Sequence, residues 1–188
     1  QPPDVEAALG MLTHQQEDLA RMASIVSTMR GVFSESGAKP HPIDLFALCK
    51  NLDLLVNAQT NKRGIHIEYV HEGDTQIQAR ASELQQVALN LMGNAFDALI
   101  AHQTKDPCVR ISVRRLDAQV VWTVEDNGPG IAPDLQPEVF NILKTTKSEG
   151  MGLGLWLARY ITERNGGEIT AGRSELGGAQ FTLSFPAV

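Results

Sequence analysis

The sequence has little cysteine and lacks any long hydrophobic run. Its two cysteines, Cys49 and Cys108, are too few for a disulfide framework and lack metal-ligand spacing, so we interpret them as thiols in a reducing compartment. No apolar stretch approaches the roughly 20 residues that span a bilayer, and there is no signal peptide. We therefore expect a cytoplasmic segment with no membrane span of its own. Because the chain starts with Gln1 rather than Met, a span elsewhere in a longer protein stays open.

Positive charge is also scarce. The chain has 16 Lys and Arg residues against 22 Asp and Glu residues, and its formal net charge of −6 argues against a general nucleic-acid binder. A hydrophobic content of 43% and a charged content of 20% are typical of a globular protein. Any anion that this protein binds must therefore be held by local groups rather than by its overall field.

Two structural units are predicted, with a turn-rich linker between them. Residues 5–33 read as one helix because apolar side chains recur in the a and d positions of a coiled-coil seam: Leu12, Leu19, Met22, Val26, Met29 and Phe33. The linker SESGAKPHP contains Gly37, Pro40 and Pro42. We therefore expect a helical unit over residues 1–36 and a larger domain over residues 43–188.

The larger domain mixes helices and strands in an irregular order. Its predicted elements are helices over 43–63, 82–102 and 153–164, paired strands over 64–70 and 75–81, a hairpin over 109–116 and 119–126, and closing strands over 167–172 and 179–186. This order predicts an α+β fold, a two-layer sandwich of a mixed sheet with helices on one face, preceded by the long N-terminal helix. The loop over 127–151 has glycines at both ends, as a hinged lid would.

The predicted helix over 82–102 has a buried side formed by Leu84, Val87, Ala88, Leu91, Ala95, Ala98 and Leu99. Another side carries amides and acids, although Asn is a poor helix former. Glu83, Gln86, Asn90, Asn94 and Asp97 fall within about 80° of one another. Asn90 and Asn94 are one turn apart and can present two amide oxygens to one hard cation such as Mg²⁺. An ordinary polar helix face is the alternative.

The segment VEDNGPGI (124–131) places a carboxylate where a strand gives way to a Gly-Pro-Gly turn. Asp126 could accept a hydrogen bond from an amino group such as the exocyclic amine of adenine. Gly128 and Gly130 would let a flat ring approach the backbone. A turn with no ligand is the alternative.

Three glycines precede the predicted helix over 153–164, in the segment KTTKSEGMGLGL (144–155). The segment is neither a Walker loop nor a dinucleotide fingerprint. Gly150, Gly152 and Gly154 would expose backbone N–H groups to phosphates at a helix N-terminus, and Lys144 and Lys147 would add positive charge. A flexible linker is the alternative.

In this order, NLMGNAFDA, DNGPGI, KTTKSEGMGLGL and GGAQFTLSFP resemble the ATP-binding domain of sensor histidine kinases, within the superfamily of gyrase, Hsp90 and mismatch-repair ATPases. The resemblance covers residues 43–186. It implies an enzyme that binds ATP and Mg²⁺ under a mobile lid and transfers the γ-phosphoryl group to a histidine. Its implied partners are the phosphoacceptor helix of the full-length kinase, a response-regulator receiver domain and a second copy of the chain. The segment would be the cytoplasmic part of a bacterial sensor.

Roles follow from the resemblance residue by residue. Asn94 resembles the Mg²⁺ ligand, and Asn90 its companion in catalysis and cofactor binding. Asp126 resembles the acid that recognises adenine. The remaining cofactor-binding residues implied are Gly128, Gly130, Ile131, Thr146, Lys147, Gly150, Gly152, Leu153 and Gly154, with Lys147 also catalytic.

The chain departs from the family pattern in three places. Many relatives read EPFFTTK where this chain reads NILKTTK (141–147), and Ala179 stands where many have threonine. His14 is followed by Gln15 and no downstream proline, unlike the family's acceptor histidine. We therefore expect residues 5–33 to be the second helix of the dimerisation hairpin, with the acceptor on a helix missing from this chain. A non-catalytic nucleotide-binding module and a conformational ATPase are the alternatives.

Overall fold

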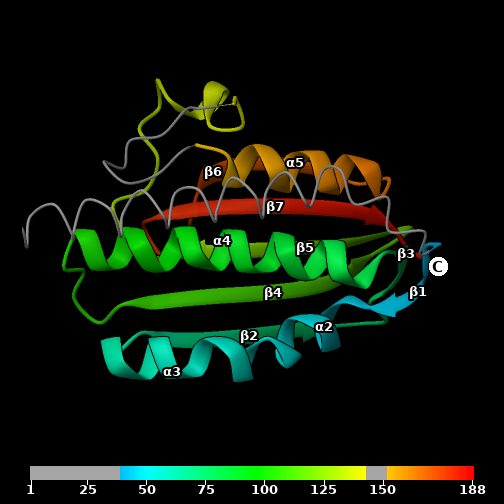
Figure 1. Cartoon of the computed structure of the whole chain (residues 1–188), viewed down its shortest axis with the longest axis horizontal. Coiled ribbons are helices and arrows are strands. Elements are labelled where there is room, and N and C mark those ends of the chain that lie inside the picture. The colour runs from blue at the N-terminus through cyan, green and yellow to red at the C-terminus, as the bar shows by residue number, and fades with distance from the viewer. Residues whose placement is uncertain (1–38, 143–151) are drawn as a thin grey trace, which may run out of the picture.

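A five-stranded sheet forms one layer of the computed structural model, which describes residues 39–142 and 152–188 (Figure 1). Its strand order is β2 (His66–Glu72), β4 (Cys108–Leu116), β5 (Gln119–Asp126), β7 (Ala179–Pro186) and β6 (Glu168–Arg173). The β2–β4 pair is parallel and the other three pairs are antiparallel. The predicted hairpin over 109–126 and the two closing strands are confirmed.

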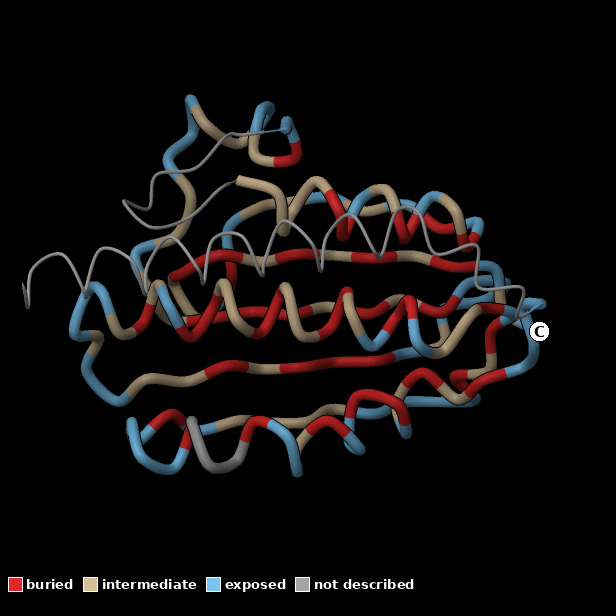
Figure 2. Tube along the Cα trace, viewed as in Figure 1, coloured by how far each residue is buried: buried red, intermediate tan, exposed pale blue. Residues whose placement is uncertain are grey.

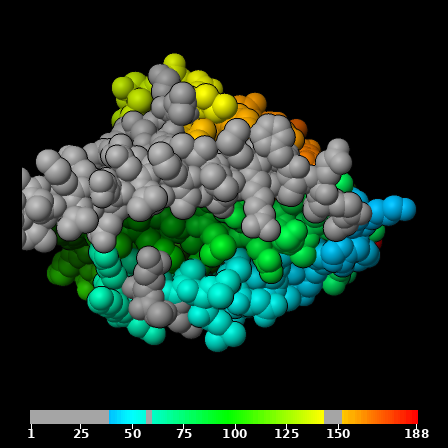
Figure 3. Space-filling view, viewed as in Figure 1, coloured from blue at the N-terminus to red at the C-terminus, as the bar shows by residue number. Residues whose placement is uncertain are grey.

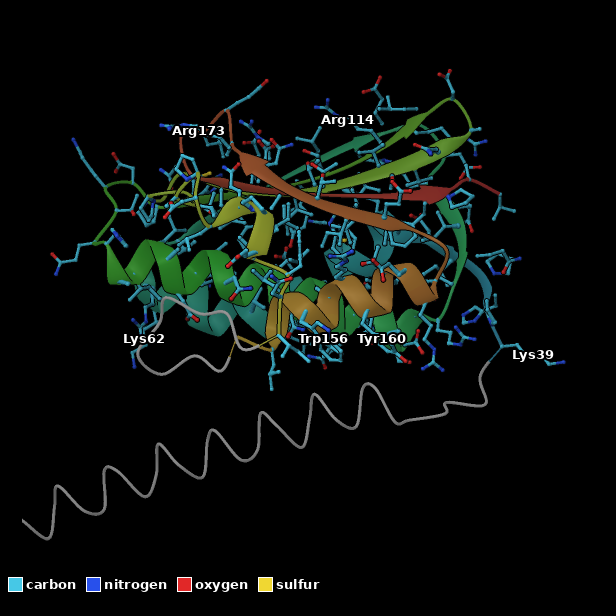
Figure 4. The ribbon with its side chains drawn as sticks, turned by 90° about the horizontal axis from the view of Figure 1, so that it is seen from above. Lys39, Lys62, Arg114, Trp156, Tyr160 and Arg173 are labelled. Carbon is cyan, nitrogen blue, oxygen red and sulfur yellow. The ribbon has the colours of Figure 1, made fainter. Side chains whose placement is uncertain are left out.

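Helices form the second layer, on one face of the sheet (Figure 4). They are α2 (Leu45–Asn51), α3 (Asp53–Arg63), α4 (Ala81–Ala101) and α5 (Gly154–Arg164), with a short 3₁₀ helix, η1 (Gln136–Glu138). None of the helices in these ranges is long and apolar enough to cross a membrane. The predicted two-layer α+β sandwich is therefore confirmed, whereas its preceding helix lies outside the described residues.

The core lies between the two layers. Buried residues follow one side of α4 and the strands behind it (Figure 2). On α4 they are Leu84, Val87, Ala88, Leu91, Met92, Ala95, Phe96 and Leu99, and Trp122 and Phe185 are the largest fully buried side chains on the sheet. The predicted buried side of this helix is thus confirmed except for Ala98, which is half-buried, and Met92 and Phe96 are buried in addition.

The predicted helix over 43–63 is wrong in its start and its continuity. Residues 41–44 form β1 (His41–Asp44), and α2 begins only at Leu45. Asp44 caps α2, because its carboxylate accepts hydrogen bonds from the backbone N–H groups of Phe46 (3.0 Å) and Ala47 (3.2 Å). A break at Leu52 separates α2 from α3.

The predicted pairing of strand 64–70 with strand 75–81 is also wrong. β2 pairs with β4, whereas β3 (Gln76–Ala79) pairs with β1. Gly73 between them has a φ of +77°, and a Cβ there would lie 2.8 Å from Arg115 Cβ on β4. The chain therefore passes against β4 instead of folding back on β2, and β3 meets β1 and the bridge to Ala187.

Candidate functional site

Asn90 lies on α4 beside the first residue of α5. Its Nδ2 donates to the carbonyl oxygen of Gly154 (3.3 Å), and its Oδ1 accepts from Nε2 of Gln86 (3.1 Å). Asn94 follows one turn later and is half-buried. The two asparagines therefore lie on one side of α4, as predicted. In this arrangement Asn90 directs its side-chain N–H group, rather than its oxygen, toward Gly154 at the start of α5.

Glu83 does not belong to this polar side, contrary to the prediction. It is 7% exposed, and its Oε2 accepts from Nδ2 of Asn165 (2.7 Å) just after α5. Arg80 and Arg164 place guanidinium nitrogens 3.8 and 3.6 Å from its oxygens. Asn165 also accepts from the backbone N–H of Arg80 (2.9 Å). The hydrogen bond between Glu83 and Asn165 therefore links the start of α4 to the end of α5.

Asp126 is a buried acid at the end of β5, with 3% of its surface exposed. Its Oδ1 accepts from the backbone N–H groups of Gly128 (2.8 Å) and Ala179 (3.2 Å), and Oδ2 receives no hydrogen bond from the described residues. Burial raises the pKa of Asp126 above its ordinary value of 3.8, and the two N–H donors oppose that shift. One oxygen is thus fixed by the backbone, and the other is left for an external donor.

Two glycine turns enclose Asp126. Gly130 has a φ of +79°, and a Cβ there would lie 3.2 Å from the carbonyl oxygen of Gly178. A Cβ on Gly178 would overlap Asp126 Oδ1 and lie 2.5 Å from the Asp126 carbonyl oxygen. Ile131, after the first turn, packs against the core. Because these positions are glycines, the backbone of both turns can approach the Asp126 carboxylate closely.

The phosphate-side residues that the structure describes are Gly152, Leu153 and Gly154. Gly152 has a φ of +65°, a conformation that favours glycine. Leu153 is the N-cap of α5 and makes no side-chain capping hydrogen bond. The first turn of α5 therefore keeps backbone N–H groups that an anion could bind. Thr146, Lys147 and Gly150 lie outside the described residues.

Helix α4 connects the two ends of the site. Asn90 meets Gly154 at one point, and Ala98 and Leu99 lie 3.8 and 3.6 Å from the Cβ position of Gly128 two turns later. Eight helical residues span about 12 Å. The acid and its glycine turn therefore lie at one end of a strip along α4, and the mouth of α5 lies at the other.

The sequence assigned no role to three residues that shape the site. Gln86 orients Asn90, and Gly178 gives the backbone its approach to Asp126. Asn127 accepts from the Cys108 N–H (2.8 Å) and donates to the Asp106 carbonyl (3.0 Å), which fixes the end of β5. Two of them carry a signal in the sequence: Gln86 falls on the predicted polar side of the helix, and the paired glycines at 177–178 suggest close backbone approach.

The start of the loop after the first glycine turn is anchored to the sheet. Phe140 is buried and packs edge-on against Phe181 of β7, with ring centroids 6.3 Å apart.

A separate hollow of about 300 Å³ lies between the end of α3 and α4. On the face shown in Figure 3 the surfaces of these two helices adjoin. The hollow is lined by Arg63, Ile65, Gly93, Phe96, Asp97, Ile100 and Ala101. None of the residues predicted to bind cofactor or metal lines this hollow, so it lies apart from the candidate site.

Comparison with known proteins identifies the family. Residues 79–188 match the model of the histidine kinase-, DNA gyrase B- and HSP90-like ATPase family. The chain belongs to this family. The matched region contains α4, Asp126, both glycine turns and α5, so the strip along α4 lies wholly within the family's ATPase domain.

Individual members of the ATPase family agree with this assignment. The sensor histidine kinase TmoS of Ectopseudomonas mendocina is 32% identical over 99% of this chain, which spans only 19% of TmoS. The solved catalytic domain of the histidine kinase ThkA is 26% identical, with a TM-score of 0.71 over 79% of this chain and 96% of that one. Full-length ShkA in complex with AMPPNP is 26% identical, with a TM-score of 0.70 over 97% of this chain and 39% of ShkA.

Proposed function

We propose that this chain is the ATP-binding catalytic region of a sensor histidine kinase, which transfers the γ-phosphoryl group of ATP to a histidine of the full-length protein. Membership of the ATPase family and the likeness to TmoS and ShkA support this function. The observation that carries it is Asp126, whose Oδ1 accepts from two backbone N–H groups while Oδ2 accepts none from the part of the chain that the structure describes. A buried acceptor of this kind suits the exocyclic amine of adenine.

The strip along α4 would then hold the rest of the nucleotide. The Gly128–Gly130 turn would lie against the base, and the N–H groups at Gly152, Leu153 and Gly154 would bind phosphates. Asn94 would hold Mg²⁺ through its amide oxygen, a hard donor of the kind Mg²⁺ prefers, and the ion would neutralise phosphate charge. Thr146, Lys147 and Gly150 would complete the phosphate side from the lid.

The domain division and the partners are part of the same proposal. Residues 1–36 would form the second helix of the dimerisation hairpin, residues 43–188 the catalytic domain, and the chain would form a homodimer in the cytoplasm. A response-regulator receiver domain would accept the phosphoryl group afterwards. ThkA was solved with the response regulator TrrA, but at 23% identity that likeness shows the fold alone.

Incubation with γ-labelled ATP and a separately made hairpin helix bearing the acceptor histidine tests the transfer. We expect label on the histidine of that peptide, and much less with Asp126→Asn at limiting ATP. AMPPNP binding to the same preparation is measured by calorimetry. Binding without transfer to any candidate helix would favour a regulatory module, and absence of binding would refute the ATP site.

A further inference from the structure

Three residues from two helices form a hydrogen-bonded chain at the phosphate end of the strip. Gln86 Nε2 donates to Asn90 Oδ1 (3.1 Å), and Asn90 Nδ2 donates to the Gly154 carbonyl (3.3 Å). Gln86 and Asn90 are both half-buried and one turn apart on α4. An amide carries its donors and its acceptor on different atoms, so both bonds form in only one of its two orientations.

The two bonds differ in what they depend on. Gly154 is the first residue of α5, so the hydrogen bond from Asn90 to its carbonyl oxygen depends on where α5 lies relative to α4. Gln86 lies on the same helix as Asn90, and its hold does not depend on the position of α5. The terminal torsion of asparagine is broad and roughly two-fold, so the amide can turn over when nothing fixes it.

We propose that Gln86 is a positioning residue that keeps the N–H group of Asn90 directed toward the phosphate side of the site. Asn90 then binds the nucleotide as a hydrogen-bond donor to phosphate oxygen, and Asn94 supplies the amide oxygen for the cation. This assignment rests on the proposed nucleotide site and divides the labour between two asparagines that look equivalent in sequence. It replaces the expectation that both present oxygens to one ion.

Two substitutions of Gln86 test whether its side chain sets the orientation of the Asn90 amide. Gln86→Met keeps the length of the side chain and removes the donor. Gln86→Glu places a carboxylate beside Asn90 Oδ1. Because a carboxylate only accepts hydrogen bonds, it would attract Asn90 Nδ2 in place of Oδ1 and so rotate the amide by half a turn. Gln85 is exposed and makes neither of these hydrogen bonds, so Gln85→Met is the matched control.

Calorimetric titration with Mg·AMPPNP measures the effect. We expect Gln86→Met to weaken binding roughly three- to tenfold and Gln86→Glu to weaken it further, with Gln85→Met unchanged. In an Asn90→Ala background, Gln86→Met should cause no further loss, because Gln86 acts only through Asn90. Parent-like affinity of Gln86→Met, or an equal loss in both backgrounds, would overturn the assignment.

A measurement without nucleotide keeps this test apart from that of the proposed function. The side-chain NH₂ signal of Asn90 in a ¹H–¹⁵N spectrum is identified by its loss in Asn90→Ala. We expect Gln86→Met to shift that signal and Gln85→Met to leave it in place. An unmoved signal would refute the positioning role even if nucleotide binds, whereas a shifted signal in a chain that binds no Mg·AMPPNP would refute the nucleotide site alone.

Discussion

Gly178 lies so close to Asp126 that no side chain fits between them. The Gly178 N–H donates to the Asp126 carbonyl oxygen (3.1 Å), and a Cβ on Gly178 would overlap Asp126 Oδ1. It would also lie 2.6 Å from the Gly128 nitrogen. The turn before β7 and the turn after β5 are therefore in backbone contact around one carboxylate. A side chain at position 178 would therefore disturb the acid.

We expect Gly178→Ala to disrupt both the fold locally and the binding of nucleotide. Movement of the Asp126 side chain alone would not relieve the overlap, because the Asp126 carbonyl oxygen and the Gly128 nitrogen lie 2.5 and 2.6 Å from the same Cβ position. The backbone of both turns must therefore shift, at a cost of about 1–3 kcal/mol. Gly172→Ala on β6 is the control, because a Cβ there meets nothing within 4 Å. Thermal unfolding and AMPPNP titration check the pair. Equal behaviour of the two variants would contradict the close approach.

Asp126→Asn should separate stability from binding. An asparagine Oδ1 can still accept from Gly128 and Ala179, but its NH₂ group would replace the free Oδ2. Losing that acceptor should lower nucleotide affinity roughly ten- to a hundredfold. Exposed Asp134→Asn serves as the control for charge alone.

The pH dependence of the fold tests the environment of the same acid. Because burial raises the pKa of Asp126 above 3.8, the folded protein binds this proton more readily than the unfolded chain. The stability that Asp126 contributes is therefore present below pH 3.8 and is lost as the pH rises from 3.8 through the raised pKa. Near neutral pH, Asp126→Asn should unfold no earlier than the parent in urea. A variant less stable than the parent there would contradict the burial effect.

Asn94→Ala should remove the Mg²⁺-dependent part of nucleotide binding and spare the rest. The substitution deletes the amide oxygen proposed to hold the ion, while Asp126 and the glycine turns keep their geometry. Titrations of ADP with Mg²⁺ and with EDTA in its place measure the difference. We expect the two affinities to converge in the variant and to differ in the parent. If the affinities of Asn94→Ala for ADP with Mg²⁺ and with EDTA differ as much as those of the parent, Asn94 does not hold the cation.

Sequence patterns predicted what depends on neighbouring residues. The hairpin over 109–126 and the buried side of α4 follow from local periodicity, and the position of Asp126 follows from its glycine turn. Glu83 was assigned to the wrong group because a helical angle does not tell which distant segment covers it, and Asn165 reaches it from 82 residues away. The partner of β3 was missed for the same reason, because Ile77 meets Ile43 and Ala187 rather than β2.

The contact between Glu83 and Asn165 should be worth more to stability than an exposed ion pair of similar geometry. Asn165→Ala removes a donor from a buried carboxylate and an acceptor from the Arg80 N–H, at a cost of about 1–3 kcal/mol. Glu163→Ala breaks the exposed pair with Arg159 (2.8 Å), which contributes at most about 1 kcal/mol. Urea unfolding of both variants measures the contrast. Equal losses of unfolding free energy in the two variants would contradict a larger contribution from the buried contact.

The N-terminal unit should hold two copies of the chain together. Residues 5–33 lie outside the described residues, so this prediction rests on the seven-residue apolar period alone. Burial of each Leu, Val, Met or Phe side chain is worth about 1.5–3 kcal/mol, which favours a partner for the stripe. Leu19→Glu and Val26→Glu place charge in the seam and should shift sedimentation at tens of micromolar toward the monomer, whereas Ser24→Glu adds the same charge off the seam and should leave the dimer intact. A parent that sediments as a monomer would exclude this interface and leave docking on the ATPase domain as the way to cover the stripe.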